Sequence, residues 1–304
     1  MLPRGSAIRL RRVPAARQAR EPTMEQVTVR VPASTSNLGP GFDCLGVALR
    51  LYNEVTVRRG EGPPLAPMVS EAAELFFAKG GTEAFSFNAE IGGDVPSSRG
   101  LGSSVTVRLG VMHGLNLLTG RPLKREQVFQ LCVELEGHPD NAAPAEFGGF
   151  NLVGGGARQR FLVAANVKFI LLVPDFEVST TEARALLPDE VGRRGAVQSS
   201  GNAAAIAAAF ASRNYAALSG AFVDHLHQPF RKQLVPFFDD AIAAAEEAGA
   251  LGGFLSGSGS TVAAVTLRNP ENIAAAMLLA APLGARVFIT TADNRGARVF
   301  PTRS

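Results

Sequence analysis

Apolar and polar residues alternate in the first segments of the chain, a pattern that predicts half-buried β-strands. Val27, Val29 and Val31 are separated by polar side chains. We expect Pro32 to end this strand. Residues 33–43 (ASTSNLGPGFD) are rich in small and turn-forming residues and are expected to form a loop.

Strands and helices alternate along the rest of the chain. Residues 47–58 (VALRLYNEVTVR) are rich in β-branched and aromatic side chains, and apolar positions alternate again over 85–91, so both are predicted strands. A helix is expected from the end of the glycine-rich segment 92–104 to about Leu118. The other predicted helices are 124–136 and about 180–187, 202–212, 236–248 and 271–281, and the other predicted strands are 168–173 and about 261–267 and 285–290. Strands separated by helices predict an α/β or α+β fold in two lobes, with the boundary between residues 150 and 175.

Composition is that of a globular protein, since 46% of the 304 residues are hydrophobic and 19% are charged. No apolar stretch is long enough to span a bilayer, so we expect no membrane partner. Neither Cys44 nor Cys132 belongs to a CxxC motif and there is no HExxH motif, so neither a zinc site nor a disulfide framework is supported. We therefore expect a protein of the reducing cytoplasm.

The net charge of +3 is unevenly distributed along the chain. Residues 1–23 hold six arginines and one glutamate, a balance of +5, so residues 24–304 carry −2. The body lacks the basic surface that nucleic acid needs, and no nucleic-acid partner is expected. The arm could be a targeting peptide, a polyanion-binding tail, or sequence upstream of a start at Met24. We favour the last because a strand pattern begins just after Met24, and we expect residues 1–23 to be a disordered or non-native extension.

A glycine- and serine-rich segment, residues 96–104 (PSSRGLGSS), leads into the first predicted helix. Gly100 and Gly102 let the backbone bend so that successive N–H groups can point at one anion, and the helix start adds its dipole. Ser103 and Ser104 could cap the helix or offer a hydroxyl to Mg²⁺ or phosphate. The competing interpretation is an ordinary glycine turn with a serine cap, and no GxxxxGK[ST] motif is present.

Residues 136–144 (EGHPDNAAP) gather polar side chains just after a predicted helix. The carboxylate of Glu136 and the cluster of His138, Asp140 and Asn141 could hold Mg²⁺ and orient an acceptor hydroxyl. The same residue types are common in turns that have no catalytic role, which is the competing interpretation.

A third candidate loop, residues 255–261 (LSGSGST), lies just before a predicted apolar strand. Its two glycines permit close backbone approach, either to phosphate or to the first glycine loop. Tight hairpins have the same composition, so this segment alone is weak evidence.

Together these segments resemble the motifs of the GHMP kinases, a superfamily of small-molecule kinases. The diagnostic order is PASxSNLGPGFD, here from Pro32, then GLGSS, here from Gly100, then SGSG, here from Ser256. The similarity covers about residues 27–290. The segments most similar to the members that phosphorylate homoserine are 37–46 (NLGPGFDCLG), 136–144 (EGHPDNAAP), 179–184 (STTEAR) and 224–231 (DHLHQPFR).

The resemblance implies a function and a fold. The implied reaction is ATP- and Mg²⁺-dependent phosphorylation of the side-chain hydroxyl of L-homoserine to O-phospho-L-homoserine, a step of threonine biosynthesis. The implied fold is α+β, with a ribosomal-protein-like N-terminal lobe at 24–165 and a ferredoxin-like C-terminal lobe at 166–304. ATP is expected between the lobes. Members of the family are often dimers, so a homodimer is expected.

The resemblance also implies roles for individual residues. The expected ATP contacts are Pro96, Ser97, Ser98, Arg99, Gly100, Leu101, Gly102, Ser103, Ser104, Ser258 and Gly259. The expected Mg²⁺ ligands are Ser104, or Ser103 beside it, and Glu136. The expected amino-acid contacts are Asn37, Asp43, His138, Thr180, Arg184 and Arg231. The catalytic candidates are Asn141, where the acceptor hydroxyl is expected, with Asp140 and Arg184.

The chemistry of homoserine suits the implied contacts. Homoserine is a zwitterion with a distal hydroxyl, so its site needs an acid for the ammonium, a role for Asp43. It also needs a guanidinium for the carboxylate, a role for Arg184 and Arg231. Thr180 and Arg184 lie four residues apart and so share one face of the predicted helix. The competing interpretation is that these arginines are solvated surface charges.

The sequence offers no obvious strong base for the acceptor hydroxyl. Asp140 is the only local carboxylate besides Glu136 and Glu146, and it could be structural. We therefore expect catalysis by positioning and by electrostatic stabilisation of the transferring phosphoryl group, with the hydroxyl proton passing to the phosphate.

Two other functions are considered. Another GHMP kinase could act on mevalonate or a sugar, but these substrates lack the ammonium that Asp43 and the paired arginines would serve. A non-catalytic ligand sensor is disfavoured because the phosphate loops and Glu136 are intact. Some residues depart from the family pattern, namely 105–107 (VTV) where small residues are usual and Ser260 where proline is common. The segment 60–84 is short and proline-rich, so the residues that contact the adenine ring stay unassigned.

Overall fold

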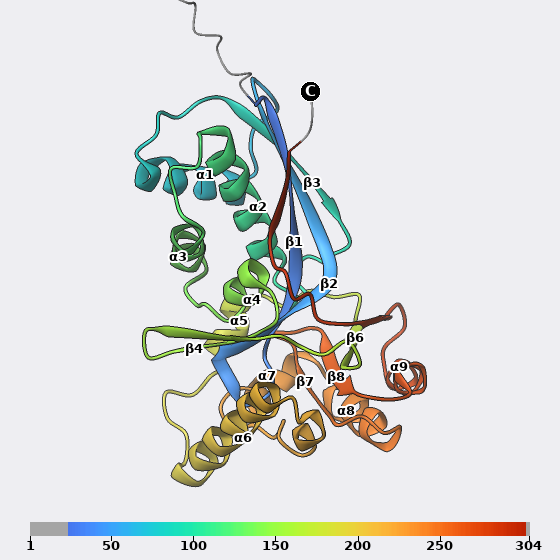
Figure 1. Cartoon of the computed structure of the whole chain (residues 1–304). Helices are drawn as coiled ribbons and strands as arrows, with labels where there is room; N and C mark the ends of the chain where they lie inside the picture. Colours follow the sequence, from blue (N-terminus) through green and yellow to red (C-terminus); the bar gives the residue numbers. More distant parts are fainter. Residues whose placement is uncertain (1–23, 302–304) are drawn as a thin grey trace, which may run out of the picture.

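The computed structural model describes residues 24–301, so the expectations for residues 1–23 lie outside the described chain. Two antiparallel sheets form two lobes, one above the other in Figure 1. The first sheet has the order β10-β1-β2-β4-β5, with β3 also paired to β2. Its strands are β1 (Gln26–Asn37), β2 (Gly41–Arg59), β3 (Phe87–Gly93), β4 (Phe150–Gly154), β5 (Ala157–Phe161) and β10 (Arg298–Pro301).

Helices cover one face of the β1-β2-β3 part of the first sheet (Figure 1). They are α1 (Pro67–Gly80), α2 (Ser103–Leu118), α3 (Arg125–Glu136) and α4 (Ala142–Phe147). The inward valines of β1 and β2 are fully buried beneath them. Two glycines let α2 lie close to the sheet, because a Cβ at Gly110 would come 2.4 Å from Val55 and one at Gly114 would come 2.5 Å from Val57.

The second sheet has the order β7-β8-β6-β9. Its strands are β6 (Lys168–Val173), β7 (Gly252–Leu255), β8 (Val262–Thr266) and β9 (Arg286–Thr290). Ile170 and Leu172 pack with the helices α8 (Phe238–Glu247) and α9 (Pro270–Leu279), whereas Phe169 and Leu171 face a core that includes α6 (Arg193–Ser212) and β2. Both faces of β6 are therefore buried, which explains its unbroken apolar run.

Short helices complete the second lobe. They are α5 (Thr180–Ala185), α7 (Gln228–Arg231) and the 3₁₀ turns η1 (Tyr215–Leu218) and η2 (Lys232–Leu234). Within residues 24–301, no helix combines the length and the apolar character needed to cross a membrane.

Most predicted elements are present within a few residues of their expected bounds, but the end of the first strand was wrong. β1 continues past Pro32 to Asn37 instead of giving way to a loop. Pro32 lies opposite Tyr52 while Ala33 lies opposite Leu49, a register shift at which the missing proline N–H is tolerated. The strand thereby carries its polar residues down to the junction of the lobes.

Other corrections concern helix starts and short elements. α6 begins at Arg193, not near residue 202. Its first turns were missed because they are mostly exposed and carry no apolar stripe. Helix α1 was not predicted in the proline-rich segment, where Pro67 occupies the first helical turn and is compatible with helix there. The other unpredicted elements are α4, α7, β4, β5, β7 and β10.

The chain crosses between the lobes more than once. After β9 in the second sheet it returns, and β10 pairs with the outer edge of β1. The division at residues 165 and 166 stays a prediction.

Candidate active site

A cavity of about 730 Å³ lies where the two lobes meet. Nearly all the expected site residues line it. Those that line it are Asn37, Asp43, Ser97, Ser98, Arg99, Gly100, Gly102, Ser103, Ser104, Glu136, His138, Asp140, Asn141, Thr180, Arg184, Arg231 and Ser258. The expected ATP contacts that do not line it are Pro96, Leu101 and Gly259.

The glycine loop bends sharply just before α2. Gly100 and Gly102 have φ of 73° and 67°, in the left-handed region that favours glycine. A Cβ at Gly100 would lie 2.1 Å from the carbonyl oxygen of Ser256, so no other residue fits without displacing the backbone. Gly102 is the N-cap residue of α2 and its start has no side-chain cap, so the competing interpretation of a glycine turn with a serine cap was wrong. The first N–H groups of α2 therefore lack a side-chain acceptor at the cavity wall.

The third loop braces the glycine loop. The Ser256 hydroxyl donates to the carbonyl oxygen of Gly100 at 2.7 Å and also bonds the Thr35 hydroxyl at 2.8 Å. The Gly257 amide donates to the carbonyl of Ser36 at 3.2 Å. The sequence left open whether the glycines of this loop approach phosphate or the first glycine loop. The structure shows the close contact with the first glycine loop.

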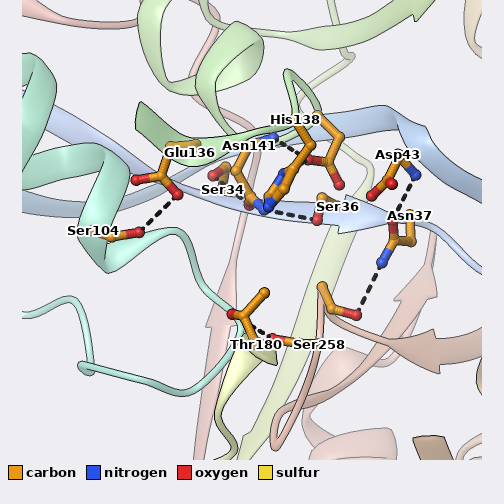
Figure 2. A network of polar contacts seen from close by, with 12 residues as sticks. Ser34, Ser36, Asn37, Asp43, Ser104, Glu136, His138, Asn141, Thr180 and Ser258 are labelled. Atoms are coloured by element: carbon orange, nitrogen blue, oxygen red, sulfur yellow. Dashed lines mark hydrogen bonds and ion pairs between the residues drawn. The ribbon is translucent and has the colours of Figure 1, made fainter. Parts of the chain in front are cut away.

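Glu136 and Ser104 meet at one end of the cavity. The Ser104 hydroxyl donates to Glu136 Oε2 at 3.1 Å (Figure 2). Arg108, one helical turn after Ser104, donates to Glu136 Oε1 and pairs with Glu71 at 3.4 Å. Arg108 lines the cavity but was not anticipated, because its partner on α3 is 28 residues away.

Asn141 is fixed from the strand side. Its Oδ1 accepts from the Ser34 hydroxyl at 2.9 Å and its Nδ2 donates to the Ser36 hydroxyl at 2.9 Å (Figure 2). Ser34 and Ser36 were not singled out from the sequence, although their alternate spacing on one strand was a usable signal. With both ends of its amide engaged, Asn141 presents a single orientation to the cavity.

His138 and Asp140 form a hydrogen-bonded pair beside Asn141. His138 Nδ1 lies 2.6 Å from Asp140 Oδ1, which also accepts from the Asn141 amide at 3.0 Å. Burial alone would lower the pKa of His138, but the hydrogen bond and charge of Asp140, with the charge of Asp43, outweigh burial and raise the pKa. Asp140 is itself buried, so these contacts hold its carboxylate in place.

Asp43 and Arg184 pair with each other across the cavity. Arg184 Nη2 donates to Asp43 Oδ1 at 2.8 Å and Nη1 donates to Oδ2 at 3.1 Å, a two-pronged pair. The Asp43 amide donates to Asn37 Oδ1 at 3.0 Å, and Asn37 Nδ2 donates to the carbonyl of Gly257 at 2.9 Å. The sequence predicted these groups together but not their mutual pairing.

Arg231 approaches the same place from α7. It is 2% exposed, and its Nε and Nη1 donate to the carbonyl oxygens of Ala183 and Gly257 at 3.2 and 3.3 Å. Burial, with the nearby charge of Arg184, lowers the pKa of Arg231 to about 10, so it stays a cation at neutral pH. The interpretation of Arg231 as a solvated surface charge was wrong.

Thr180 closes the opposite wall of the cavity. It is the first residue of α5, whose N-cap Ser179 accepts from the Glu182 amide. The Thr180 hydroxyl bonds that of Ser258 at 3.2 Å (Figure 2). The predicted shared face is confirmed, since Thr180 and Arg184 both line the cavity.

Two sets of oxygen and nitrogen donors could hold a metal ion. Ser104 and Glu136 supply hard oxygen ligands next to the glycine loop. Asp43, His138 and Asp140 have ligand atoms within 4.8 Å of one another, the one such group of three among residues 24–301. A cation at the second set would compete with the Arg184 guanidinium for Asp43.

Comparisons with known proteins agree with this geometry. The family model of the GHMP kinases N terminal domain matches residues 67–149, and that of the GHMP kinases C terminal domain matches residues 199–281. The chain is 38% identical over 303 residues to the homoserine kinase of Caldicellulosiruptor bescii, covering 91% of this chain and 98% of that protein. It is 38% identical to the homoserine kinase of Microchaete diplosiphon, covering 90% and 97%. A crystal structure of homoserine kinase from Cytophaga hutchinsonii superposes with a TM-score of 0.83 at 28% identity, covering 93% and 99% of the two chains.

Proposed function

Because the chain belongs to the GHMP kinase family, and within it to the homoserine kinases, we propose that its cavity transfers the γ-phosphoryl group of ATP to the side-chain hydroxyl of L-homoserine. The product is O-phospho-L-homoserine, an intermediate of threonine biosynthesis. The observation that carries this proposal is one cavity in which the glycine loop at the start of α2 faces an acid and two arginines. These are the groups that a triphosphate and a zwitterionic amino acid require.

The ATP phosphates are proposed to bind at residues 97–104. The positive φ of Gly100 and Gly102 and the uncapped start of α2 support this assignment, because both turn backbone N–H groups toward an anion. Ser258 approaches from the third loop and would close the other side of the phosphates. Pro96, Leu101 and Gly259 would act by shaping the loops and not by contact.

Mg²⁺ is proposed to bind at Ser104 and Glu136. A hydroxyl and a nearly buried carboxylate, 3.1 Å apart and next to the phosphate site, are suitable donors for this ion. When bound, the ion neutralises charge on the phosphate oxygens. Arg108 shares the Glu136 carboxylate, so it would either balance the same charge or turn toward the phosphates.

The amino acid is proposed to replace the pair between Asp43 and Arg184. Its ammonium takes the place of the guanidinium at Asp43, and its carboxylate takes the place of Asp43 at Arg184, with Arg231 as the second cation. Both protein groups then exchange one ion pair for another, which limits the desolvation cost of binding. Asn37, His138 and Thr180 offer the remaining polar contacts on the cavity wall.

Catalysis is proposed to rest on position and electrostatics. Asn141, held by Ser34 and Ser36, would orient the acceptor hydroxyl toward the γ-phosphorus. The Asp140 carboxylate is already hydrogen-bonded to the His138 ring and to the backbone N–H of Asn141. This suits a supporting role better than that of a base. The hydroxyl oxygen attacks phosphorus, the bond to the ADP oxygen breaks, and the hydroxyl proton passes to the transferred phosphate. Arg184 would assist by fixing the amino acid.

The finer description of the lobes is also a proposal. The antiparallel four-stranded sheet backed by α8 and α9 supports a ferredoxin-like second lobe, and the mixed first lobe is proposed to be ribosomal-protein-like. A homodimer follows from the family resemblance, and a cytoplasmic location follows from a cysteine pattern that supports no disulfide framework. Both stay predictions.

A coupled assay of ADP release tests the proposed substrate. Purified protein with ATP and Mg²⁺ should turn over L-homoserine, and mevalonate and sugars should give no rate above background. Turnover of mevalonate without turnover of homoserine would refute the assignment.

Two substitutions separate the proposed roles of the carboxylates. Glu136→Ala should lower kcat/KM by roughly 10²- to 10³-fold, because electrostatic stabilisation of the transferring group is lost, and excess Mg²⁺ should recover part of it. Asp140→Asn should cost about tenfold or less, since no base is required. Steady-state rates across Mg²⁺ concentrations provide the measurement. Complete inactivity of Asp140→Asn in a folded protein would instead make Asp140 the base.

A further inference from the structure

Both arginines of the site lie over one aromatic ring. The guanidinium carbon of Arg231 is 4.9 Å from the ring centroid of Phe42, and that of Arg184 is 5.5 Å from it. Phe42 is half-buried and is not one of the described residues that line the cavity, so it lies behind the arginines. Guanidinium groups at this distance are attracted to the negative face of the ring.

The ring has a rigid support. His227 stacks on Phe42, with centroids 5.2 Å apart and an angle of 25° between the planes. His227 is fully buried, and its Nε2 donates to the carbonyl of Gly39 at 2.7 Å. Burial lowers the pKa of His227 to about 4, so the ring is neutral at pH 7 and brings no third positive charge beside the two arginines.

The support is in turn anchored to the helix that carries Arg231. Asp224 accepts from the backbone amides of His227 and Gln228 at 2.9 and 2.8 Å, just ahead of α7. The buried Asp224 carboxylate therefore fixes the backbone at His227, which stacks on Phe42, and at the start of α7, which carries Arg231.

Arg231 has few other contacts that could fix it. Its guanidinium donates to two carbonyl oxygens, whereas that of Arg184 has the carboxylate of Asp43. Two like charges this close repel each other unless something holds them. The Phe42 ring supplies a surface that both can share without neutralising either. Arg231 then keeps its charge for an anion, and Arg184 does so once the substrate ammonium has replaced it at Asp43.

From these contacts we propose that Phe42 is a positioning residue for substrate specificity: its ring sets the spacing of Arg184 and Arg231 so that the two grip the α-carboxylate of the amino acid. This inference rests on the proposed function. Phe42 would then determine how strongly the enzyme requires a carboxylate without itself touching the substrate.

The test compares homoserine with 3-amino-1-propanol, the same amino alcohol without its carboxylate. Phe42→Leu should raise the KM for homoserine by about tenfold, since one desolvated cation–π contact is worth a factor of that order. The kcat and the KM for ATP should change by less than about threefold. The inhibition constant of 3-amino-1-propanol against homoserine should be unchanged within a similar margin, because this ligand does not use the arginines. Phe42→Tyr should restore the KM for homoserine, since the ring is kept.

Phe300→Leu is the matched control, because the exposed Phe300 carries Arg30 over its ring at 5.3 Å far from the cavity. It should leave both constants unchanged. Thermal unfolding checks that each variant is folded, and Phe42→Met replaces Phe42→Leu if the latter is not. An equal loss for homoserine and 3-amino-1-propanol would overturn the inference, as would failure of Phe42→Tyr to restore binding. If the wild-type protein does not phosphorylate homoserine at all, the proposed function fails first and is identified separately.

Discussion

Two histidines in one site have pKa values moved in opposite directions by their surroundings. His227 is sealed from water, so desolvation lowers its pKa to about 4. His138 is also affected by burial, but its bond to Asp140 outweighs this and raises its pKa. Near neutral pH His227 is therefore an uncharged structural group, while His138 is the group whose charge responds to pH.

His227 should make the fold sensitive to mild acid. In the unfolded chain the pKa of His227 is the ordinary 6.5. Between pH 6.5 and about 4 the unfolded state therefore binds more protons than the folded state, and the free energy of unfolding decreases as the pH decreases. Between pH 7 and pH 5 this amounts to about 2 kcal/mol. His138, whose pKa is raised, acts in the opposite direction, so the two proteins must be compared. Between pH 7 and pH 5, urea unfolding should show a loss about 2 kcal/mol larger in the wild type than in His227→Gln, which keeps an N–H donor for Gly39. Equal losses in the two proteins would show that His227 is not the sensor.

Sequence reasoning identified residue types well and their partners poorly. It placed Asp43 and Arg184 in one site, but their direct pair spans 141 positions and no local pattern reports such a contact. Phe42 was missed because an aromatic residue in a motif looks like core. Its role depends on Arg231 and His227, which only the fold brings near.

At the scale of elements, the short helix α4 depends on one buried glutamate. Glu146 is fully buried, accepts from Arg125 Nε on α3 at 2.6 Å, and lies 2.8 Å from His113 Nε2 on α2. Despite desolvation, the charges of these two partners lower the pKa of Glu146. Because α4 begins directly after Asn141, this cluster anchors the turn that carries the proposed catalytic amide.

Neutralising this glutamate should destabilise the protein more than neutralising an exposed one. Glu146→Gln should lower the free energy of unfolding by roughly 2 kcal/mol, because the fully buried side chain loses its charge-assisted hydrogen bonds with Arg125 and His113. Glu126→Gln is the matched control, since its pair with Arg158 is half exposed and is worth less than about 1 kcal/mol. Guanidinium unfolding curves of both variants provide the comparison. Similar losses in the two would contradict the anchoring role.

Element prediction succeeded where packing leaves a clear local pattern. α3 buries a periodic face, whereas α2, β6 and β8 are buried almost throughout and are rich in apolar residues. All four were predicted near their true bounds. α4 was not predicted, because its stability comes from Glu146 and its partners 21 and 33 residues away and not from an apolar stripe. β10 was missed for a similar reason, since it pairs with the first strand of the chain.

At the scale of the whole molecule, the proposed ATP site is shared by the two lobes. The glycine loop belongs to the first lobe, and the loop that braces it belongs to the second. Ser256 is the link, because its fully buried hydroxyl bonds both Gly100 and Thr35. The shape of the glycine loop therefore depends on the contact between the lobes.

Removing the Ser256 hydroxyl should impair ATP binding selectively. Ser256→Ala leaves the partly buried carbonyl of Gly100 without this donor, a cost of about 1 kcal/mol that loosens the loop. The KM for ATP should rise about three- to tenfold, while the KM for homoserine should change less. Ser260→Ala is the control, since Ser260 is equally buried but its hydroxyl donates to the carbonyl of Phe176 and not to Gly100. Initial-rate kinetics with each substrate varied in turn provide the measurement. Equal increases of the KM for ATP in Ser256→Ala and Ser260→Ala would refute the role of Ser256 as the link between the lobes.

The pairing of β10 with β1 has a consequence for the order in which the protein can be made. β1 is the first described strand to leave the ribosome and β10 the last, so the outer edge of β1 must wait for nearly the whole chain to be synthesised. An exposed strand edge can recruit other nascent chains during that interval. The first sheet therefore cannot be completed before the second lobe has been synthesised. A contact that spans almost the full length of the polypeptide should make maturation slow relative to its size.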